Sequence, residues 1–185
     1  MRIAILVCTS NQPGTMVKTL TSIANLAIPA SSSCTFTIVN NSVKPMTPGD
    51  FEIHVKALPT TVVNEPSPGL SIARNTGISC IEADYVIFTD DDVTVPSNWL
   101  ATYEAAFRRY PDAVFFGSDI APVFLETDGP WGHAFSAAAG SCFARFQVGP
   151  RDRKIDARTR SALYPFGANM AFRVDALRHF RFDEN

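Results

Sequence analysis

The most constraining feature of the sequence is an unbroken apolar run at its beginning, from Ile3 to Val7. A strand with one face in water alternates apolar and polar residues, whereas a parallel strand covered on both faces is apolar throughout. The run ends in a polar turn from Thr9 to Gly14, and apolar side chains then recur at the spacing of a helix. We therefore predict a buried strand followed by a helix.

The same alternation continues along the chain. We predict further strands at 36–39, 51–58, 85–88 and 113–116, and helices over 70–81 and 97–110. Strands separated by helices form right-handed βαβ units and an open, mostly parallel sheet flanked by helices. The predicted fold class is therefore α/β and Rossmann-like, with ligands bound beyond the carboxyl ends of the strands.

Composition limits the partners of the chain. Its 185 residues are 46% hydrophobic and 18% charged, which fits one compact domain. A net charge of −2 supplies no cationic field for nucleic acid, so we expect no nucleic-acid partner. Apolar runs fall far short of the roughly 20 residues that span a bilayer, and a signal-peptide pattern is lacking. We expect a cytoplasmic protein.

The charge is unevenly distributed, because residues 143–181 carry nine basic and three acidic side chains. Many of the basic residues lie between Arg151 and Arg160. Such a region is either a solvated loop face or a seat for an anionic ligand. The second interpretation includes a lipid-linked acceptor and peripheral association with the inner face of the membrane.

Three consecutive carboxylates, Asp90 to Asp92, follow the predicted strand at 85–88. Like charges in a row repel each other unless they are hydrated or neutralised by a cation. In an extended segment Asp90 and Asp92 point to the same side, so both can face one hard cation such as Mg²⁺, which prefers oxygen ligands. The alternatives are a metal and diphosphate site or an acidic turn before a helix.

Two further segments carry polar residues among apolar ones. Arg74 and Asn75 lie on the predicted helix at 70–81, where a guanidinium either faces solvent or binds an oxyanion through two parallel donors. Asn169 follows a turn at Gly167 and is the residue of its segment that we expect to point into a site. GxSxG, P-loop and GxGxxG motifs do not follow any predicted strand, which argues against hydrolases, NTPases and dinucleotide dehydrogenases.

Taken in order, the segments LVCTSNQP, IVNNS, EPSPGLSIARNTGI, YVIFTDDDV, PSNWL and FGANMAFR resemble the family 2 glycosyltransferases, which have the GT-A fold. The resemblance runs from Ile3 to Glu184. It implies a metal-dependent, inverting transfer of a sugar from a nucleotide-diphosphate sugar to an acceptor hydroxyl on a glycan or lipid-linked molecule. The leaving diphosphate would be stabilised by Mn²⁺ or Mg²⁺, and a carboxylate would deprotonate the acceptor.

The resemblance also implies roles for particular residues. Thr9, Ser10 and Asn40 would hold the nucleotide, with Arg74 and Asn75 approaching it. The run at Asp90, Asp91 and Asp92 would contact the donor as the DxD motif, with Asp90 and Asp92 as the metal ligands. Asn169 would border the sugar and acceptor pocket.

The sequence departs from the family pattern at three places. Ser10 and Gln12 stand where an aromatic and a basic residue are common, which implies weaker stacking on the base. Asn40 replaces an acidic residue and is both donor and acceptor, so it does not identify the base. The family's general base follows a segment like FDEN, which places it beyond Asn185, with Asp183 and Glu184 as less favoured substitutes.

We therefore interpret residues 1–185 as a single GT-A domain. Residues 1–118 would form the nucleotide and metal half, and 119–185 the start of the acceptor half, incomplete at its C-terminal end. Two other functions remain open at this stage: a non-catalytic module that binds nucleotide sugars, and a nucleotidyltransferase, which would release pyrophosphate from a nucleoside triphosphate. Fold analogy alone does not separate them.

Overall fold

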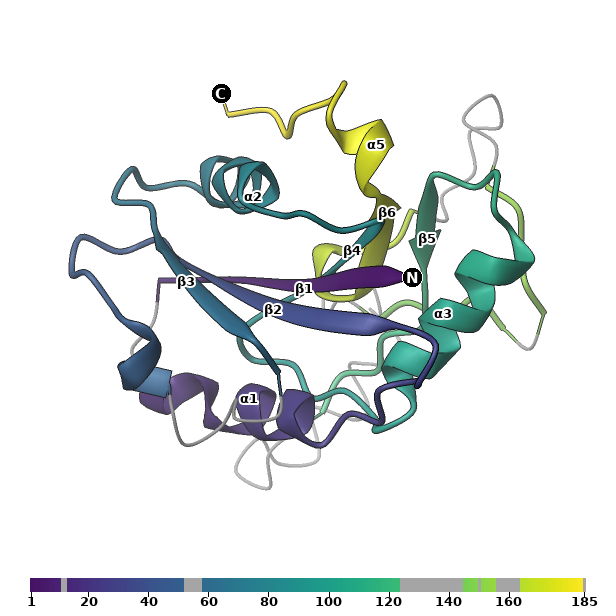
Figure 1. Cartoon of the computed structure of the whole chain (residues 1–185), viewed down its shortest axis with the longest axis horizontal. Helices are drawn as coiled ribbons and strands as arrows, with labels where there is room; N and C mark the ends of the chain where they lie inside the picture. The colour runs from purple at the N-terminus through teal and green to yellow at the C-terminus, as the bar shows by residue number, and fades with distance from the viewer. Residues whose placement is uncertain (11–12, 52–57, 124–144, 150, 156–163, 185) are drawn as a thin grey trace.

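The computed structural model describes residues 1–10, 13–51, 58–123, 145–149, 151–155 and 164–184. Its centre is a six-stranded sheet in the order β3-β2-β1-β4-β6-β5 (Figure 1). The first four strands along the chain are parallel: β1 (Arg2–Thr9), β2 (Ser33–Asn40), β3 (Thr60–Asn64) and β4 (Tyr85–Thr89). Two more complete the sheet, β5 (Phe115–Gly117) and β6 (Met170–Arg173), with β6 antiparallel to both of its neighbours.

The first two strands and β4 are buried as the apolar runs predicted. Residues Ile3 to Val7 are at most 1% exposed, and every residue of β4 is buried. Because side chains of a strand alternate between faces, each of these strands supplies two separate apolar clusters, one on each side of the sheet. A strand that is apolar on both faces requires a helical layer on each face.

Helices supply both layers (Figure 1). On one face α1 (Val17–Ala24), entered through the 3-10 turn η1 (Pro13–Met16), and α3 (Trp99–Arg109) pack against the larger cluster. On the other face lie α2 (Leu70–Ser79) and the short α5 (Val174–Leu177). Gly77 allows α2 to approach closely, because an added Cβ would lie 2.5 Å from Leu6 Cδ1 and 2.8 Å from Val39 Cγ2.

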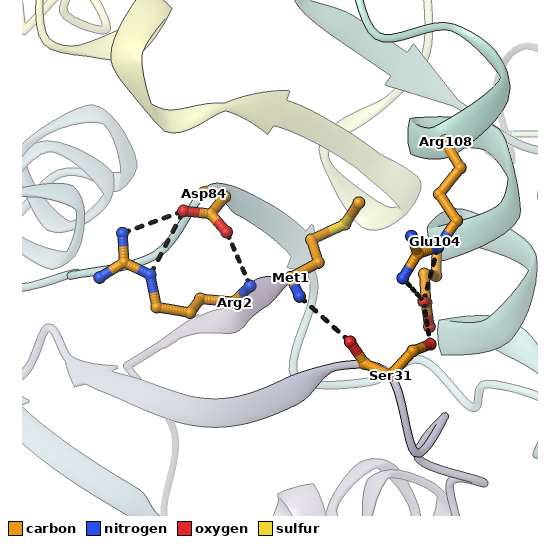
Figure 2. Close-up of polar contacts among 6 residues, drawn as sticks. All are labelled: Met1, Arg2, Ser31, Asp84, Glu104 and Arg108. Atoms are coloured by element: carbon orange, nitrogen blue, oxygen red, sulfur yellow. Dashed lines mark hydrogen bonds and ion pairs between the residues drawn. The ribbon is translucent and has the colours of Figure 1, made fainter.

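Polar contacts fasten the amino end of β1 (Figure 2). The Asp84 carboxylate accepts hydrogen bonds from the backbone N–H of Arg2 at 2.8 Å and from its guanidinium at 2.9 Å. The N-terminal ammonium donates to the Ser31 carbonyl at 3.1 Å. Glu104 of α3 accepts from the Ser31 hydroxyl and from Arg108, which ties the helix to the loop before β2.

One predicted strand falls mostly on residues that the structure does not describe. The sequence pattern favoured 51–58, but the third strand is Thr60–Asn64, and Phe51 belongs to the 3-10 turn η2 (Pro48–Phe51). Residues 52–57 lie outside the described part of the chain. The described third strand is short and largely half-exposed, and it pairs with β2 through Phe36 and Thr60.

Candidate functional site

Four parallel strands have their carboxyl ends on the same side of the sheet, which we call its carboxyl edge, and polar residues lie there. Thr9, Asn40 and Asn64 are register partners at the ends of β1, β2 and β3. The chain continues in register past the strands, because the Asn41 N–H donates to the Thr9 carbonyl at 2.7 Å. As β6 is antiparallel to β4, its first residue, Met170, lies beside Phe88 and brings the preceding turn η5 (Gly167–Asn169) to the same edge. The segments that carry the predicted site residues therefore converge at one edge.

The aspartate turn after β4 is fastened by two threonines. The Thr9 hydroxyl donates to Asp91 Oδ2 at 2.5 Å, and the Thr19 hydroxyl of α1 donates to the Asp91 carbonyl at 2.7 Å. Thr9 is 3% exposed, Asp90 and Asp91 are half-buried and Asp92 is exposed. The carboxylate of Asp91 is thus turned toward β1, while that of Asp92 is open to solvent.

Arg74 is enclosed near this turn. Its side chain is 14% exposed, and Nη2 lies 3.9 Å from Asp90 Oδ1. The guanidinium carbon sits 5.3 Å from the centre of the Phe182 ring. On a further side the guanidinium meets Gly167, where an added Cβ would lie only 2.1 Å from Nη2. A cation held against a ring and a glycine has little freedom to move.

Burial and like charges act on the carboxyl group of Asp90. Burial is the largest influence and raises its pKa, Arg74 opposes this shift, and the negative charges of Asp92 and Asp91 raise it further. Burial raises the pKa of the neighbouring Cys8 thiol to about 12, so this cysteine stays protonated and unreactive near neutral pH. A cation at this turn would relieve the repulsion among the carboxylates.

Asn75 does not face the aspartates with a free amide. Its Oδ1 accepts the Phe182 N–H at 2.9 Å, and its Nδ2 donates to the Phe182 carbonyl at 2.9 Å and to Glu184 Oε1 at 2.6 Å. The residue is 6% exposed. Asn75 therefore fixes the segment after α5 against α2.

Asn40 is likewise engaged within the chain. It is fully buried; its Nδ2 donates to the Lys44 carbonyl at 2.7 Å and to Asn64 Oδ1 at 2.8 Å. Its Oδ1 accepts from the Ser42 hydroxyl at 2.8 Å. These contacts shape the loop after β2, and Ser10, after β1, stands exposed.

Asn169 connects two parts of the structure. Its Oδ1 accepts from Trp99 Nε1 at 3.0 Å and from the Tyr103 hydroxyl at 2.8 Å, both on α3. Its Nδ2 donates to the Asp119 carbonyl at 2.8 Å. Asn169 is half-buried at the edge of the sheet.

Sequence reasoning missed two residues that shape this site. Phe182 supplies the ring against Arg74, and the FDEN segment in which it lies was noted only for its place in the family pattern. Asn41 donates to the carbonyls of Glu65 and Ser67 and accepts from the Gly69 N–H, so it anchors the loop that leads into α2. The pair of asparagines after β2 was the only signal for it.

The residues at this turn fit a hard divalent cation held jointly by protein and ligand. Asp90 and Asp92 offer carboxylate oxygens, the ligand type that Mg²⁺ and Mn²⁺ favour. Within the described ranges no cluster of three or more His, Cys, Asp or Glu side chains is placed to hold a metal alone. A cation bound by Asp90 and Asp92 would thus take its other oxygens from water and from a diphosphate.

Comparison with known proteins gives the family context of the chain. The model of the family described as "Glycosyl transferase family 2" matches residues 4–181. The succinoglycan biosynthesis protein ExoM of Rhizobium meliloti is 30% identical over 119 residues, which are 63% of this chain and 38% of ExoM. A glucosyl-dolichyl phosphate glucuronosyltransferase of Haloferax volcanii is 32% identical over 59 residues, covering 32% of this chain and 19% of that protein. The matched part of the chain covers well under half the length of these curated relatives.

Solved structures show the same fold at low sequence identity. Residues 1–349 of TarS from S. aureus align with a TM-score of 0.70 and 16% identity, over 100% of this chain and 51% of that one. The mannosyltransferase PcManGT of Pyrobaculum calidifontis, solved with GDP-Man and Mn²⁺, aligns with a TM-score of 0.64 and 18% identity, over 99% of this chain and 48% of that one. These neighbours are GT-A glycosyltransferases, which confirms the predicted fold class.

Proposed function

Because the chain belongs to glycosyl transferase family 2, we propose that it binds a nucleotide-diphosphate sugar at the carboxyl edge of its sheet and transfers the sugar to an acceptor hydroxyl. The observation that carries the proposal is the convergence of Arg74 with the Asp90–Asp92 turn at that edge. A guanidinium and carboxylates around a bound cation are complementary to a diphosphate. The donors in two solved complexes of fold neighbours, UDP-GlcNAc and GDP-Man, belong to this chemical class.

The residues divide by what their polar atoms already contact. Ser10, Arg74, Asp90 and Asp92 are the candidates for direct contact with the donor, whereas the Thr9 hydroxyl is engaged with Asp91. The amides of Asn40 and Asn169 are engaged within the chain, so in this proposal both residues support the segments around the site. Asp91, held by Thr9, fixes the orientation of the turn.

Asp90 and Asp92 would hold Mn²⁺ or Mg²⁺, which supplies charge stabilisation of the leaving diphosphate. Arg74 would donate hydrogen bonds to the same phosphates. We propose a single displacement with inversion at the anomeric carbon, in which a carboxylate takes the proton of the acceptor hydroxyl. The location of that base after the Phe182–Glu184 segment stays a prediction.

A thermal-shift titration tests donor binding without an acceptor, since a ligand that binds only the folded state raises its stability. The protein is titrated with UDP, GDP, dTDP, CDP and ATP, each with and without Mn²⁺. We expect stabilisation by one nucleoside diphosphate that increases with the metal and is reversed by EDTA. Failure of all four diphosphates to shift the melting temperature contradicts the proposal, and preference for ATP with pyrophosphate release would favour a nucleotidyltransferase.

Asp92→Asn tests the metal assignment in the same titration. The change removes one charged ligand at an exposed position, so the metal-dependent part of the shift should fall while the metal-free part is kept. The matched control is Asp112→Asn, which changes an exposed aspartate in the loop before β5. A shift that depends on Mn²⁺ as strongly in Asp92→Asn as in the unchanged protein would remove Asp92 from the ligands.

The acceptor side is proposed from charge. Arg151, Arg153 and Lys154 are exposed, while Arg158 and Arg160 lie outside the described residues. No helix in the part of the chain that the structure describes is long and apolar enough to cross a bilayer. We propose that this basic segment attracts a lipid-linked acceptor or an anionic membrane surface. Binding to vesicles that ignores salt and anionic lipid content would contradict it.

A further inference from the structure

The side-chain amide of Asn75 pairs with the backbone of Phe182 in both directions, as one strand residue pairs with another. Its oxygen accepts the Phe182 N–H and its nitrogen donates to the Phe182 carbonyl, each at 2.9 Å. These residues are 107 positions apart in the sequence. Two hydrogen bonds to Phe182 fix both the position and the orientation of its backbone. Because the backbone is oriented, the direction of the Phe182 side chain is fixed as well.

The Phe182 ring is thereby directed into the space between α2 and the sheet. It meets Phe88 of β4 edge to face at 5.7 Å between ring centres, and Phe172 of β6 at 6.4 Å. The ring also meets the Arg74 guanidinium, with 5.3 Å between the guanidinium carbon and the ring centre. A cation over a ring face is attracted by it, and the guanidinium that meets this ring also lies 3.9 Å from Asp90 Oδ1.

Arg74 and Asn75 are consecutive on α2, so their side chains leave the helix about 100° apart. The Asn75 side chain bonds to the segment after α5, and the Arg74 guanidinium lies toward the aspartate turn. We propose that Asn75 is a positioning residue that acts through Phe182 on Arg74, holding the guanidinium at the diphosphate site before the donor arrives. This inference rests on the proposed function and replaces direct contact between Asn75 and the nucleotide.

Holding a side chain in its bound position reduces the ordering cost of binding. Loss of the Asn75 amide keeps the Arg74 side chain but removes the contact that holds Phe182 against its guanidinium, so the guanidinium becomes free to move. We therefore expect Asn75→Ala to weaken binding of a nucleoside diphosphate by about 3- to 10-fold. Arg74→Ala, which removes the charge itself, should weaken it more.

A double-mutant cycle tests whether the effect passes through Arg74. Dissociation constants for UDP, GDP, dTDP and CDP in the presence of MnCl₂ are measured by calorimetry for the unchanged protein, Arg74→Ala, Asn75→Ala and the double variant. If Asn75 acts through Arg74, the double variant binds no more weakly than Arg74→Ala alone. Losses that add in the double variant overturn the inference, because they require an independent role for Asn75.

Two further variants separate positioning from folding. Phe182→Leu removes the ring but leaves the backbone that Asn75 holds, and it should reproduce the loss seen in Asn75→Ala. Ser79→Ala changes the exposed last residue of α2, whose hydroxyl donates to the Thr76 carbonyl, and should bind as the unchanged protein does. Hydrogen exchange at the Phe182 amide should quicken in Asn75→Ala and stay slow in Arg74→Ala.

Failure of the inference and failure of the proposed function give different results. If the unchanged protein binds none of the four nucleoside diphosphates, the proposed function is wrong and the inference falls with it. If the unchanged protein binds one of them and Arg74→Ala binds it more weakly, yet Asn75→Ala and Phe182→Leu bind normally, the inference alone is overturned.

Discussion

At the scale of single residues, Gly167 is required by the position of Arg74. A Cβ at residue 167 would lie 2.1 Å from Nη2 and 3.1 Å from the guanidinium carbon of Arg74. The displaced group is the end of a flexible side chain, so Gly167→Ala should lower the melting temperature little. It should nevertheless weaken binding of the nucleoside diphosphate, because Arg74 must leave its place.

Calorimetry and thermal unfolding of Gly167→Ala check this prediction together. Gly49→Ala is the matched control, since an added Cβ there would make only an ordinary contact, 3.5 Å from Thr47 Oγ1. Normal affinity in Gly167→Ala would mean that the position of Arg74 does not matter for the ligand.

Asp84 carries a pH-dependent contribution to stability. The backbone N–H of Arg2 is the largest of the influences that lower its pKa, aided by the Arg2 guanidinium (Figure 2). A carboxyl whose pKa is lower in the folded state stabilises the fold above its unfolded pKa of about 4, and the contribution is lost as pH falls through the folded value. Both side chains are well exposed, at 62% for Arg2 and 43% for Asp84, so screening by solvent keeps it small.

We expect Asp84→Asn to lower the free energy of unfolding at pH 7 by up to about 1 kcal/mol, and the difference should shrink at pH 3. Urea denaturation at the two pH values measures it. Glu82→Gln, at an exposed carboxyl two residues away, provides the control. An equal difference at both pH values would show that charge on Asp84 is not the cause.

The sequence predicted which polar residues lie near the site, but it did not predict which residues they contact. The aspartate run and Arg74 could be recognised because their charges conflict with an apolar setting. Whether Asn75 faces a ligand or a backbone depends on Phe182, which is 107 residues distant, and local sequence carries no trace of that contact. The same holds for Asn169, whose partners Trp99 and Tyr103 lie on another helix.

At the scale of elements, the contact of α2 with the sheet depends on Gly77. A Cβ at residue 77 would overlap Leu6 and Val39, both fully buried, and overpacking of a core usually costs about 1–3 kcal/mol. We expect Gly77→Ala to destabilise the protein by that amount in urea denaturation. Gly14→Ala, where an added Cβ meets nothing within 4 Å, should change stability little.

A loss of stability in Gly14→Ala as large as in Gly77→Ala would contradict the packing argument, since both add the same methyl group.

The strands buried in the centre were predictable because both of their faces are apolar. The edge strand β3 was not, because its side chains are mostly half-exposed and its pairing to β2 is made by backbone groups that no side-chain pattern records.

At the scale of the whole molecule, the sheet unites the beginning and the end of the described chain. β6 lies between β4 and β5 and is the only described strand that pairs with β5. Residues 1–118, predicted as a nucleotide and metal half, therefore contain β5 without its partner and β4 with one bare edge. Sheet order of this kind leaves no trace in local periodicity, so the sequence did not show that β6 lies between β4 and β5.

We expect a fragment of residues 1–118 to lack a cooperative thermal transition, whereas the 185-residue chain unfolds in one. Circular dichroism and amide exchange compare the two. Addition of a synthetic peptide covering 164–184 should restore protection in β4 and β5 if β6 is the missing strand. A fragment that unfolds cooperatively by itself would show that β6 is dispensable.

The late position of β6 in the sequence delays completion of this site during synthesis on the ribosome. About 80 residues separate the end of β4 from the start of β6, and closing a loop of that length costs entropy before any pairing is gained. The aspartate turn is synthesised early. Gly167 and Phe182 are synthesised later, and until β6 follows, β5 has no pairing partner among the described strands. A nascent chain thus contains Asp90 to Asp92 and Arg74 well before it contains the residues that hold the Arg74 guanidinium in position.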